Sequence, residues 1–142
     1  MGKKFEWVEH PSDVGFRAFG RDLAEAFANA GLALFEIMTD TGKVEPKEEV
    51  SIELRSESET SLLYDWIDRL IALHDSFNLL LSKFKVDIER NREGLRLKAK
   101  AWGEQFNPSK HPSRTAVKAM TYHMMEIGEE EGRVWVQDVV DI

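Results

Sequence analysis

The sequence predicts an α+β fold in which two helices pack between mostly antiparallel β-sheets. Two long segments repeat apolar residues at helical spacing, whereas the segments around them alternate apolar and polar residues as half-buried strands do. The first helical segment is apolar nearly all round, which is typical of a helix that is buried on more than one side. The length of 142 residues favours one domain, residues 1–142, with a sizeable core.

The first third of the chain is expected to form two strands and a buried helix. Residues 5–9 and 13–20 read as two short strands joined by a turn. Asp22 can cap the helix that follows, and Glu25, three residues later, completes a pattern like a capping box. Residues 39–42 are expected to end the helix, with Gly42 as the stop signal, because glycine readily adopts the backbone conformation that ends a helix.

The middle of the chain predicts a strand, a second helix and a hairpin. Residues 48–56 alternate cleanly and indicate a half-buried strand. Ser58 or Thr60 opens a second, longer helix. Beyond Leu80, two alternating runs are separated by a turn at residues 91–94, so they predict a β-hairpin.

The last third of the chain is expected to be loop followed by strand. Residues 103–114 read as a loop whose basic cluster could bind an anion or an acidic surface, although a basic loop on an acidic protein is often only solvated. Residues 115–125 read as extended, with a helical start as the alternative. A charged turn at 129–132 then leads into a strand over 134–142. The whole chain therefore predicts two helices and about seven strands.

Composition excludes several classes of function. A formal charge of −7 argues against broad direct binding of nucleic acid, which needs clustered Lys and Arg. The chain contains no cysteine, which excludes disulfides, thiolate metal sites and cysteine nucleophiles. The sequence shows no secretory signal and no apolar run of membrane-spanning length. We therefore expect a cytoplasmic protein without membrane partners.

The segment 9–15 concentrates polar chemistry between two expected strands. His10 and Asp13 lie three residues apart, and a turn would let both side chains point into one small volume. Strands hold side chains in place while a turn exposes them, as a functional site requires. The alternative is a plain connecting turn, in which Asp13 accepts backbone hydrogen bonds and His10 is partly exposed.

A second acidic group lies at the other end of the chain. Asp141 is followed by Ile142, whose α-carboxylate is charged at neutral pH if the chain ends there. With Asp13, these groups would form a cluster of three carboxylates, which repel one another unless they are solvated or neutralised by a cation. Clusters of oxygen ligands suit hard ions such as calcium, magnesium or manganese. The alternative is a frayed acidic end in water, because periodicity does not show whether the two ends meet.

Four segments in this order resemble the archease family, and the resemblance covers essentially the whole chain. They are the His-x-x-Asp-x-Gly element within 9–15, the Trp-containing helix at 63–71, the Lys-Ala-x-Thr-Tyr-His element within 117–123, and the closing residues 139–142. Many family members have Thr-Ala where this chain has Pro11-Ser12. The resemblance implies a layered α+β sandwich as the fold.

The resemblance also implies a function. Archeases assist an RtcB-type tRNA-splicing RNA ligase rather than catalyse, by promoting guanylylation of the ligase and its multiple turnover. Parts of the family are implicated in modulating a tRNA cytosine methyltransferase, which gives the family a chaperone-like label. We therefore expect a non-catalytic activator whose main partner is the ligase, with a tRNA methyltransferase as a second expected partner.

Family metal binding carries over to three positions. Asp13, Asp141 and Ile142, the last through its terminal carboxylate or carbonyl, are the expected ligands, with calcium as the expected ion and magnesium or manganese as alternatives. His10 would orient these ligands. Lys118 and His123, which lie in a matching segment, are candidates for supporting the site or for contacting the partner.

Two further hypotheses remain open. In the first, the protein is a stand-alone metal-dependent hydrolase, with His10 as general base beside a cation-activated water. This hypothesis requires turnover without a partner. In the second, it is a general chaperone or adaptor for RNA-modifying enzymes, which requires an exposed apolar patch and tolerance of changes at Asp13 and Asp141.

Overall fold

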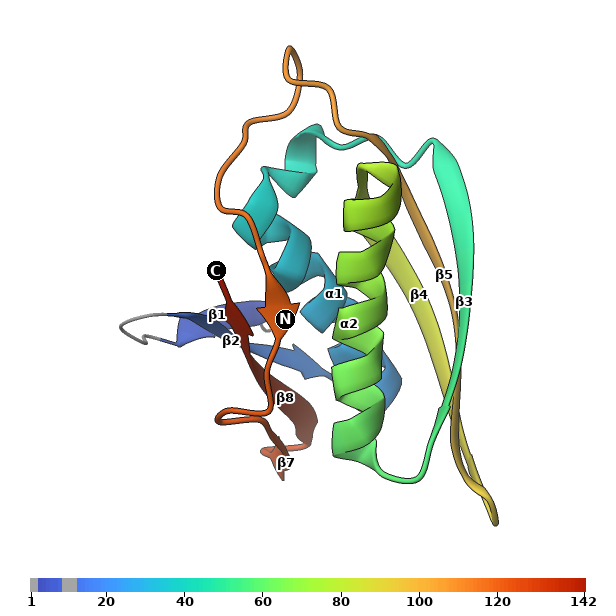
Figure 1. Cartoon of the computed structure of the whole chain (residues 1–142). Coiled ribbons are helices and arrows are strands. Elements are labelled where there is room, and N and C mark those ends of the chain that lie inside the picture. The colour runs from blue at the N-terminus through green and yellow to red at the C-terminus, as the bar shows by residue number, and fades with distance from the viewer. Residues whose placement is uncertain (1–2, 9–12) are drawn as a thin grey trace.

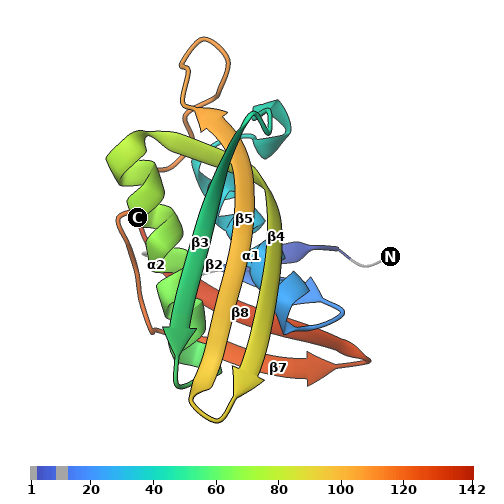
Figure 2. The same ribbon diagram turned by 90° about the vertical axis from the view of Figure 1, so that its right-hand side faces the viewer.

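Two antiparallel sheets enclose two helices in a computed structural model that describes residues 3–8 and 13–142. Figures 1 and 2 show helices α1 and α2 lying between the sheets. Each helix contacts strands of both sheets, so each is buried on two sides. The predicted α+β fold, with helices between antiparallel sheets, is confirmed.

The first sheet joins the two ends of the chain. Among the described residues it has five strands, which are β1 (Phe5–Val8), β2 (Asp13–Gly20), β8 (Arg133–Asp141), β6 (Ala119–Met120) and β7 (Glu126–Glu130). The order across the sheet is β1-β2-β8-β6, and β7 also pairs with β8. The last strand of the chain therefore lies beside β2, near the start of the chain (Figure 1).

The second sheet is a three-stranded antiparallel sheet in the order β3-β5-β4. Its strands are β3 (Glu48–Ser56), β4 (Leu79–Asn91) and β5 (Gly94–Gln105), so the predicted strand and hairpin are confirmed. The register of β4 against β5 shifts between Leu81 and Lys83, opposite Gly103. A Cβ atom at Gly103 would lie 1.7 Å from the carbonyl oxygen of Leu80, so only glycine fits there.

Helix α1 (Leu23–Met38) begins as the sequence predicts. The Asp22 carboxylate accepts a hydrogen bond from the Glu25 N–H at 2.9 Å, which satisfies a free donor of the first turn. The helix ends at Thr39, whose backbone is extended, so the predicted end within 39–42 is confirmed, but the residue that ends it is Thr39 and not Gly42. Gly42 lies in a short 3-10 turn, Thr41–Lys43, in which its N–H donates to the Asp40 carboxylate.

Helix α2 (Glu59–Phe77) is capped by Ser58, whose hydroxyl accepts from the Ser61 N–H. Its apolar stripe is buried against α1 and both sheets. Within this core, the indole N–H of Trp66 donates to the carbonyl of Phe27 at 2.9 Å, which ties the two helices together. No helix in the described part of the chain is long and apolar enough to cross a membrane.

The segment 115–125 is more irregular than the sequence predicts. Only Ala119 and Met120 form a strand, β6, and no helix begins there. The turn at 131–132 joins β7 to β8, which gives eight strands in the described residues where about seven were expected. The extra strand arises because β6 and β7 pair with different parts of one edge of β8, opposite the edge that pairs with β2, a tertiary arrangement that alternation alone does not reveal.

Candidate metal centre

The pairing of β2 with β8 brings Asp13 directly opposite Asp141. In antiparallel pairs, side chains at directly opposite positions have Cβ atoms about 4.5–5.5 Å apart. The two carboxylates are 128 positions apart in the chain, and the sheet makes them neighbours. The interpretation of segment 9–15 as half of a split site therefore has geometric support at Asp13.

Both carboxylates lie on the sheet face that points away from the helices. Arg17 and Gln137 are another directly opposite pair on the same two strands, and their side chains hydrogen-bond at 2.8 Å. Asp13 and Asp141 lie an even number of residues from this pair, so they share its face. Phe16, on the other face, is fully buried in the core. Asp13 is half-buried and Asp141 is exposed, so an ion from solvent can reach both.

Strand β6 holds Asp141 from its other edge. Ala119 is its partner in the register, and the Lys118 N–H donates to the Asp141 carbonyl at 2.8 Å. Lys118 itself is exposed. The predicted supporting residue Lys118 is therefore adjacent to the paired carboxylates through the backbone, with its side chain accessible to a partner.

The segment 121–124 is anchored to the same sheet. The Thr121 hydroxyl donates to the Val139 carbonyl at 2.9 Å, and the Gln137 side-chain amide donates to the Met124 carbonyl at 2.9 Å. Since Gln137 lies on the face that carries the carboxylates, these two hydrogen bonds hold the segment over that face. His123 is exposed, and its N–H donates to the Thr121 hydroxyl.

The remaining two predicted site residues are Ile142, which the structure describes, and His10, which it does not. Ile142 is half-buried and its side chain packs against the core, which fixes the backbone immediately after Asp141. His10 lies outside the described residues.

The donor set fits a hard cation. Two carboxylates directly opposite each other in a sheet repel, and a divalent ion between them would relieve this repulsion. No group of three His, Asp or Glu side chains able to hold a metal occurs in residues 3–8 and 13–142. Because calcium takes 6–8 oxygen ligands, the two side chains would need oxygens from the end of the chain, from other backbone groups or from water.

Asp138 is a buried carboxylate that the sequence analysis did not single out. It is 0% exposed, and neither of its carboxylate oxygens has a hydrogen-bond partner among the described residues. Burial raises its pKa well above the usual value of 3.8. The sequence does contain a sign of this burial, because Asp138 lies two residues from both Val136 and Val140 and therefore shares the apolar face of β8 with them.

The basic cluster near residue 110 contacts acidic groups of its own chain. The Lys110 ammonium lies 2.7 Å from the Glu104 carboxylate, and the buried ring of His111 lies 3.1 Å from the same carboxylate. The hydrogen bond from Lys110, with the Glu45 N–H as the next cause, lowers the pKa of Glu104 to about 2. Arg114 pairs with Glu36 at 2.7 Å. These contacts fasten the loop after β5 to the core.

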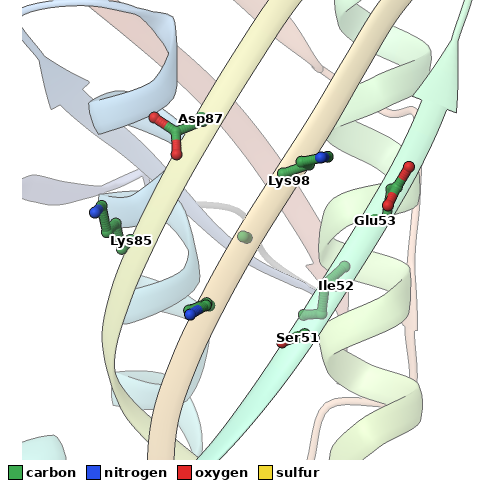
Figure 3. Close-up of a pocket in the computed structure, with 8 residues that line it drawn as sticks. Ser51, Ile52, Glu53, Lys85, Asp87 and Lys98 are labelled. Carbon is green, nitrogen blue, oxygen red and sulfur yellow. The ribbon is translucent and has the colours of Figure 1, made fainter.

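A shallow hollow of about 400 Å³ lies on the outer face of the three-stranded sheet. Figure 3 shows that its labelled charged side chains come from neighbouring strands and carry both signs. The register sets Lys98 directly between Glu53 and Asp87, so opposite charges are adjacent across the strands. This hollow is a charge-balanced sheet face.

The fold and the carboxylate pair together define a small α+β sandwich protein with a candidate cation site where β2 meets the last strand, β8. The chain matches the model of the Archease protein family (MTH1598/TM1083) over residues 5–142, and it belongs to that family.

Curated relatives cover nearly the whole chain. An archease of Sulfurisphaera tokodaii is 51% identical over 99% of both chains, and one of Methanothermobacter thermautotrophicus is 47% identical over 99% of both. Among solved structures, that of Methanobacterium thermoautotrophicum protein 1598 superimposes with a TM-score of 0.88 at 47% identity, covering 98% of this chain and 99% of that one. A Thermotoga maritima protein, described as an archease and possible chaperone, shares the fold at 20% identity, with a TM-score of 0.64 and coverage of 95% and 94%.

Proposed function

We propose that this protein is a non-catalytic, metal-binding activator of an RtcB-type tRNA-splicing RNA ligase. In this role it promotes guanylylation of the ligase and repeated turnover during tRNA splicing. Membership of the archease family supports this proposal. The observation that carries the metal-dependent part is the direct pairing of Asp13 with Asp141.

The proposed ligands are Asp13, Asp141 and the terminal carboxylate or carbonyl of Ile142, with His10 orienting them. A bound calcium ion would neutralise the paired carboxylates and supply a charge that organises this edge of the sheet or is presented to the ligase. The protein's own groups do the positioning: β2 and β6 hold Asp141 from both sides, and the packed Ile142 side chain holds the end of the backbone.

Lys118 and His123 are the proposed contacts to the ligase. Both are exposed, and hydrogen bonds anchor their segments to the strand that carries Asp141. An exposed cation and an exposed imidazole on segments anchored to β8 offer polar contacts at the rim of an interface. The ligase would therefore recognise the metal site and its surroundings as one surface.

Ligase guanylylation tests the proposal directly. Purified ligase, GTP and calcium are combined with the wild-type protein, with Asp13→Asn, or with Asp87→Asn as a matched control on the other sheet. We expect acceleration by the wild type and by Asp87→Asn, and its loss with Asp13→Asn. Equal rates of ligase guanylylation with and without the wild-type protein would rule the proposal out. Turnover by this protein in the absence of ligase would instead point to an enzyme.

A chaperone-like modulator of a tRNA cytosine methyltransferase is the second candidate. Large apolar side chains on the surface favour it: Tyr122 is 60% exposed and stacks on Tyr64, and Met124 is 42% exposed. This candidate predicts that Tyr122→Ser changes which cytosines the methyltransferase modifies, whereas Asp13→Asn does not. Sequencing of methylated sites in a transfer RNA measures both effects.

A further inference from the structure

A second hollow, of about 470 Å³, lies where β2 ends and α1 begins. Strand β2 runs eight residues from Asp13 to Gly20, so about 23 Å of extended chain separates this hollow from the carboxylate pair. Its walls come from residues 3–4, the β2–α1 junction, the start of β8, and Phe84 of β4. Figure 2 shows these elements meeting on the side of the molecule where β7 and β8 join.

The charge of this hollow is opposite to that of the protein. Lys3, Lys4, Arg21 and Arg133 line it, and Glu25 is its single carboxylate. The chain as a whole carries a formal charge of −7. Four cations drawn from three segments into one concave surface focus a positive potential, which raises the local concentration of anions.

Two of the four cations, Lys4 and Arg133, have no acidic partner within ion-pair distance among the described residues, although the Lys4 charge helps to lower the pKa of Glu25. The Arg133 guanidinium stacks 4.0 Å above the Phe19 ring, and its buried Nε–H has no acceptor among the described residues. The carbonyl of Lys4 accepts a hydrogen bond from the Phe19 N–H at 2.8 Å, which fixes the backbone of Lys4 beside Phe19 and leaves its side chain exposed. The side chains of Lys4 and Arg133 form no ion pair with any described carboxylate.

The other two cations are paired but accessible. Arg21 lies 3.0 Å from Glu25, with its side chain 90% exposed, and Lys3 lies 3.1 Å from Glu6, with its side chain 64% exposed. Exposed pairs of this kind contribute little to stability, so a more highly charged anion can compete with the carboxylates for them. The hollow therefore offers two unpaired cations and two that can be recruited.

We propose that this basic hollow binds the phosphate groups of a ligand of nucleotide size. The guanidinium fork of Arg133 matches the geometry of phosphate oxygens, and the lysines add point charges. A volume of about 470 Å³ falls within the range of small-molecule sites, and Phe19 and Phe84 supply apolar surface beside the cations. The proposal is independent of the metal centre.

The hollow on the three-stranded sheet serves as the control surface. It also contains three lysines, including Lys98 and Lys100, but acidic side chains accompany them. Removing charge there changes the net charge of the protein by the same amount as removing it from the basic hollow. A substitution in the basic hollow should therefore weaken binding more than one in the control hollow only if the ligand binds specifically in the basic hollow.

The test is a titration of the isotope-labelled full chain with pyrophosphate, followed by amide NMR. We expect saturable shifts around Gly20, Arg21 and Asn29, and a dissociation constant that rises about tenfold in Arg133→Gln and in Lys4→Gln, as the loss of one charge-assisted hydrogen bond implies. Lys98→Gln should bind like the wild type. Thermal unfolding confirms that each variant is folded, and Arg133→Lys, which keeps the charge but loses the fork, should bind with intermediate affinity.

Uridine diphosphate and guanosine diphosphate extend the test. If the nucleotides bind with the same affinity as pyrophosphate, the site recognises phosphate alone. If they bind more tightly, the site also contacts the nucleoside. Both results support the proposal. The absence of saturation, or equal weakening by Lys98→Gln and Arg133→Gln, would overturn it. Calcium binding by Arg133→Gln should be unchanged, so a failure of phosphate binding can be distinguished from a failure of the proposed metal centre.

Discussion

Replacing Asp138 by asparagine should remove a pH-dependent decrease in the free energy of unfolding. Asp138 is fully buried on the apolar face of β8, opposite Phe16, and no described group hydrogen-bonds to its carboxylate. Burial without a partner disfavours the charged form, so the pKa of Asp138 in the folded protein is raised well above 3.8. Asparagine has nearly the same shape and does not titrate.

The sign of the effect follows from proton binding. Above pH 3.8 the unfolded chain releases the Asp138 proton, whereas the folded protein keeps it until the pH reaches the raised pKa. Unfolding therefore releases one proton in this window, and the free energy of unfolding falls by about 1.4 kcal/mol per pH unit relative to the Asp138→Asn variant. Two pH units amount to about 3 kcal/mol, a large share of the 5–15 kcal/mol that stabilises a typical domain.

Urea unfolding followed by tryptophan fluorescence, at intervals from pH 4.5 to 7.5, measures the difference. Other titrating groups cancel, because both proteins contain them. Asp138→Val, which restores the apolar alternation with Val136 and Val140, should exceed the wild type in stability at pH 7 by roughly 1–3 kcal/mol or more, since it removes an unsatisfied buried polar group. A free-energy difference between wild type and Asp138→Asn that stays constant across this pH range would refute the reasoning.

Four further predictions concern the metal centre, the loop and the sheet. Calcium at a hundredfold excess over its dissociation constant should stabilise the wild type by about 2.7 kcal/mol and leave Asp13→Asn unchanged, as differential scanning fluorimetry would show. A short extension after Ile142 should abolish calcium binding in isothermal titration calorimetry, and unchanged affinity would remove Ile142 from the ligand set. Glu104→Gln should lower the free energy of unfolding, measured in urea above pH 4.5, by roughly 2 kcal/mol. This difference shrinks as the pH falls towards 2, because the contacts that lower the pKa of Glu104 stabilise only its ionised form. Gly103→Ala should cost roughly 3 kcal/mol or more and yield little folded protein on expression, because its Cβ would collide with the Leu80 carbonyl.

Much of the secondary structure could be predicted from local sequence. The Asp22 and Ser58 caps, and the alternation in 48–56 and on either side of the turn at 91–94, are confirmed because each depends on residues within a few positions of one another. Gly42 itself does not end α1, for a related reason: Asp40 offers a competing local hydrogen bond that draws the glycine into a separate turn.

The sequence by itself determined the class of fold, the absence of thiolate chemistry from a chain without cysteine, and, through motif resemblance, the family. Only the tertiary structure decided that Asp13 and Asp141 face each other, because strand pairing across 128 positions depends on the packing of both sheets around the helices. The same packing buries Asp138 without a partner, pairs Lys110 with Glu104, and gathers four cations in one hollow. Periodicity specifies which face of a strand is buried, whereas the neighbour that lies against that face is specified by the whole chain.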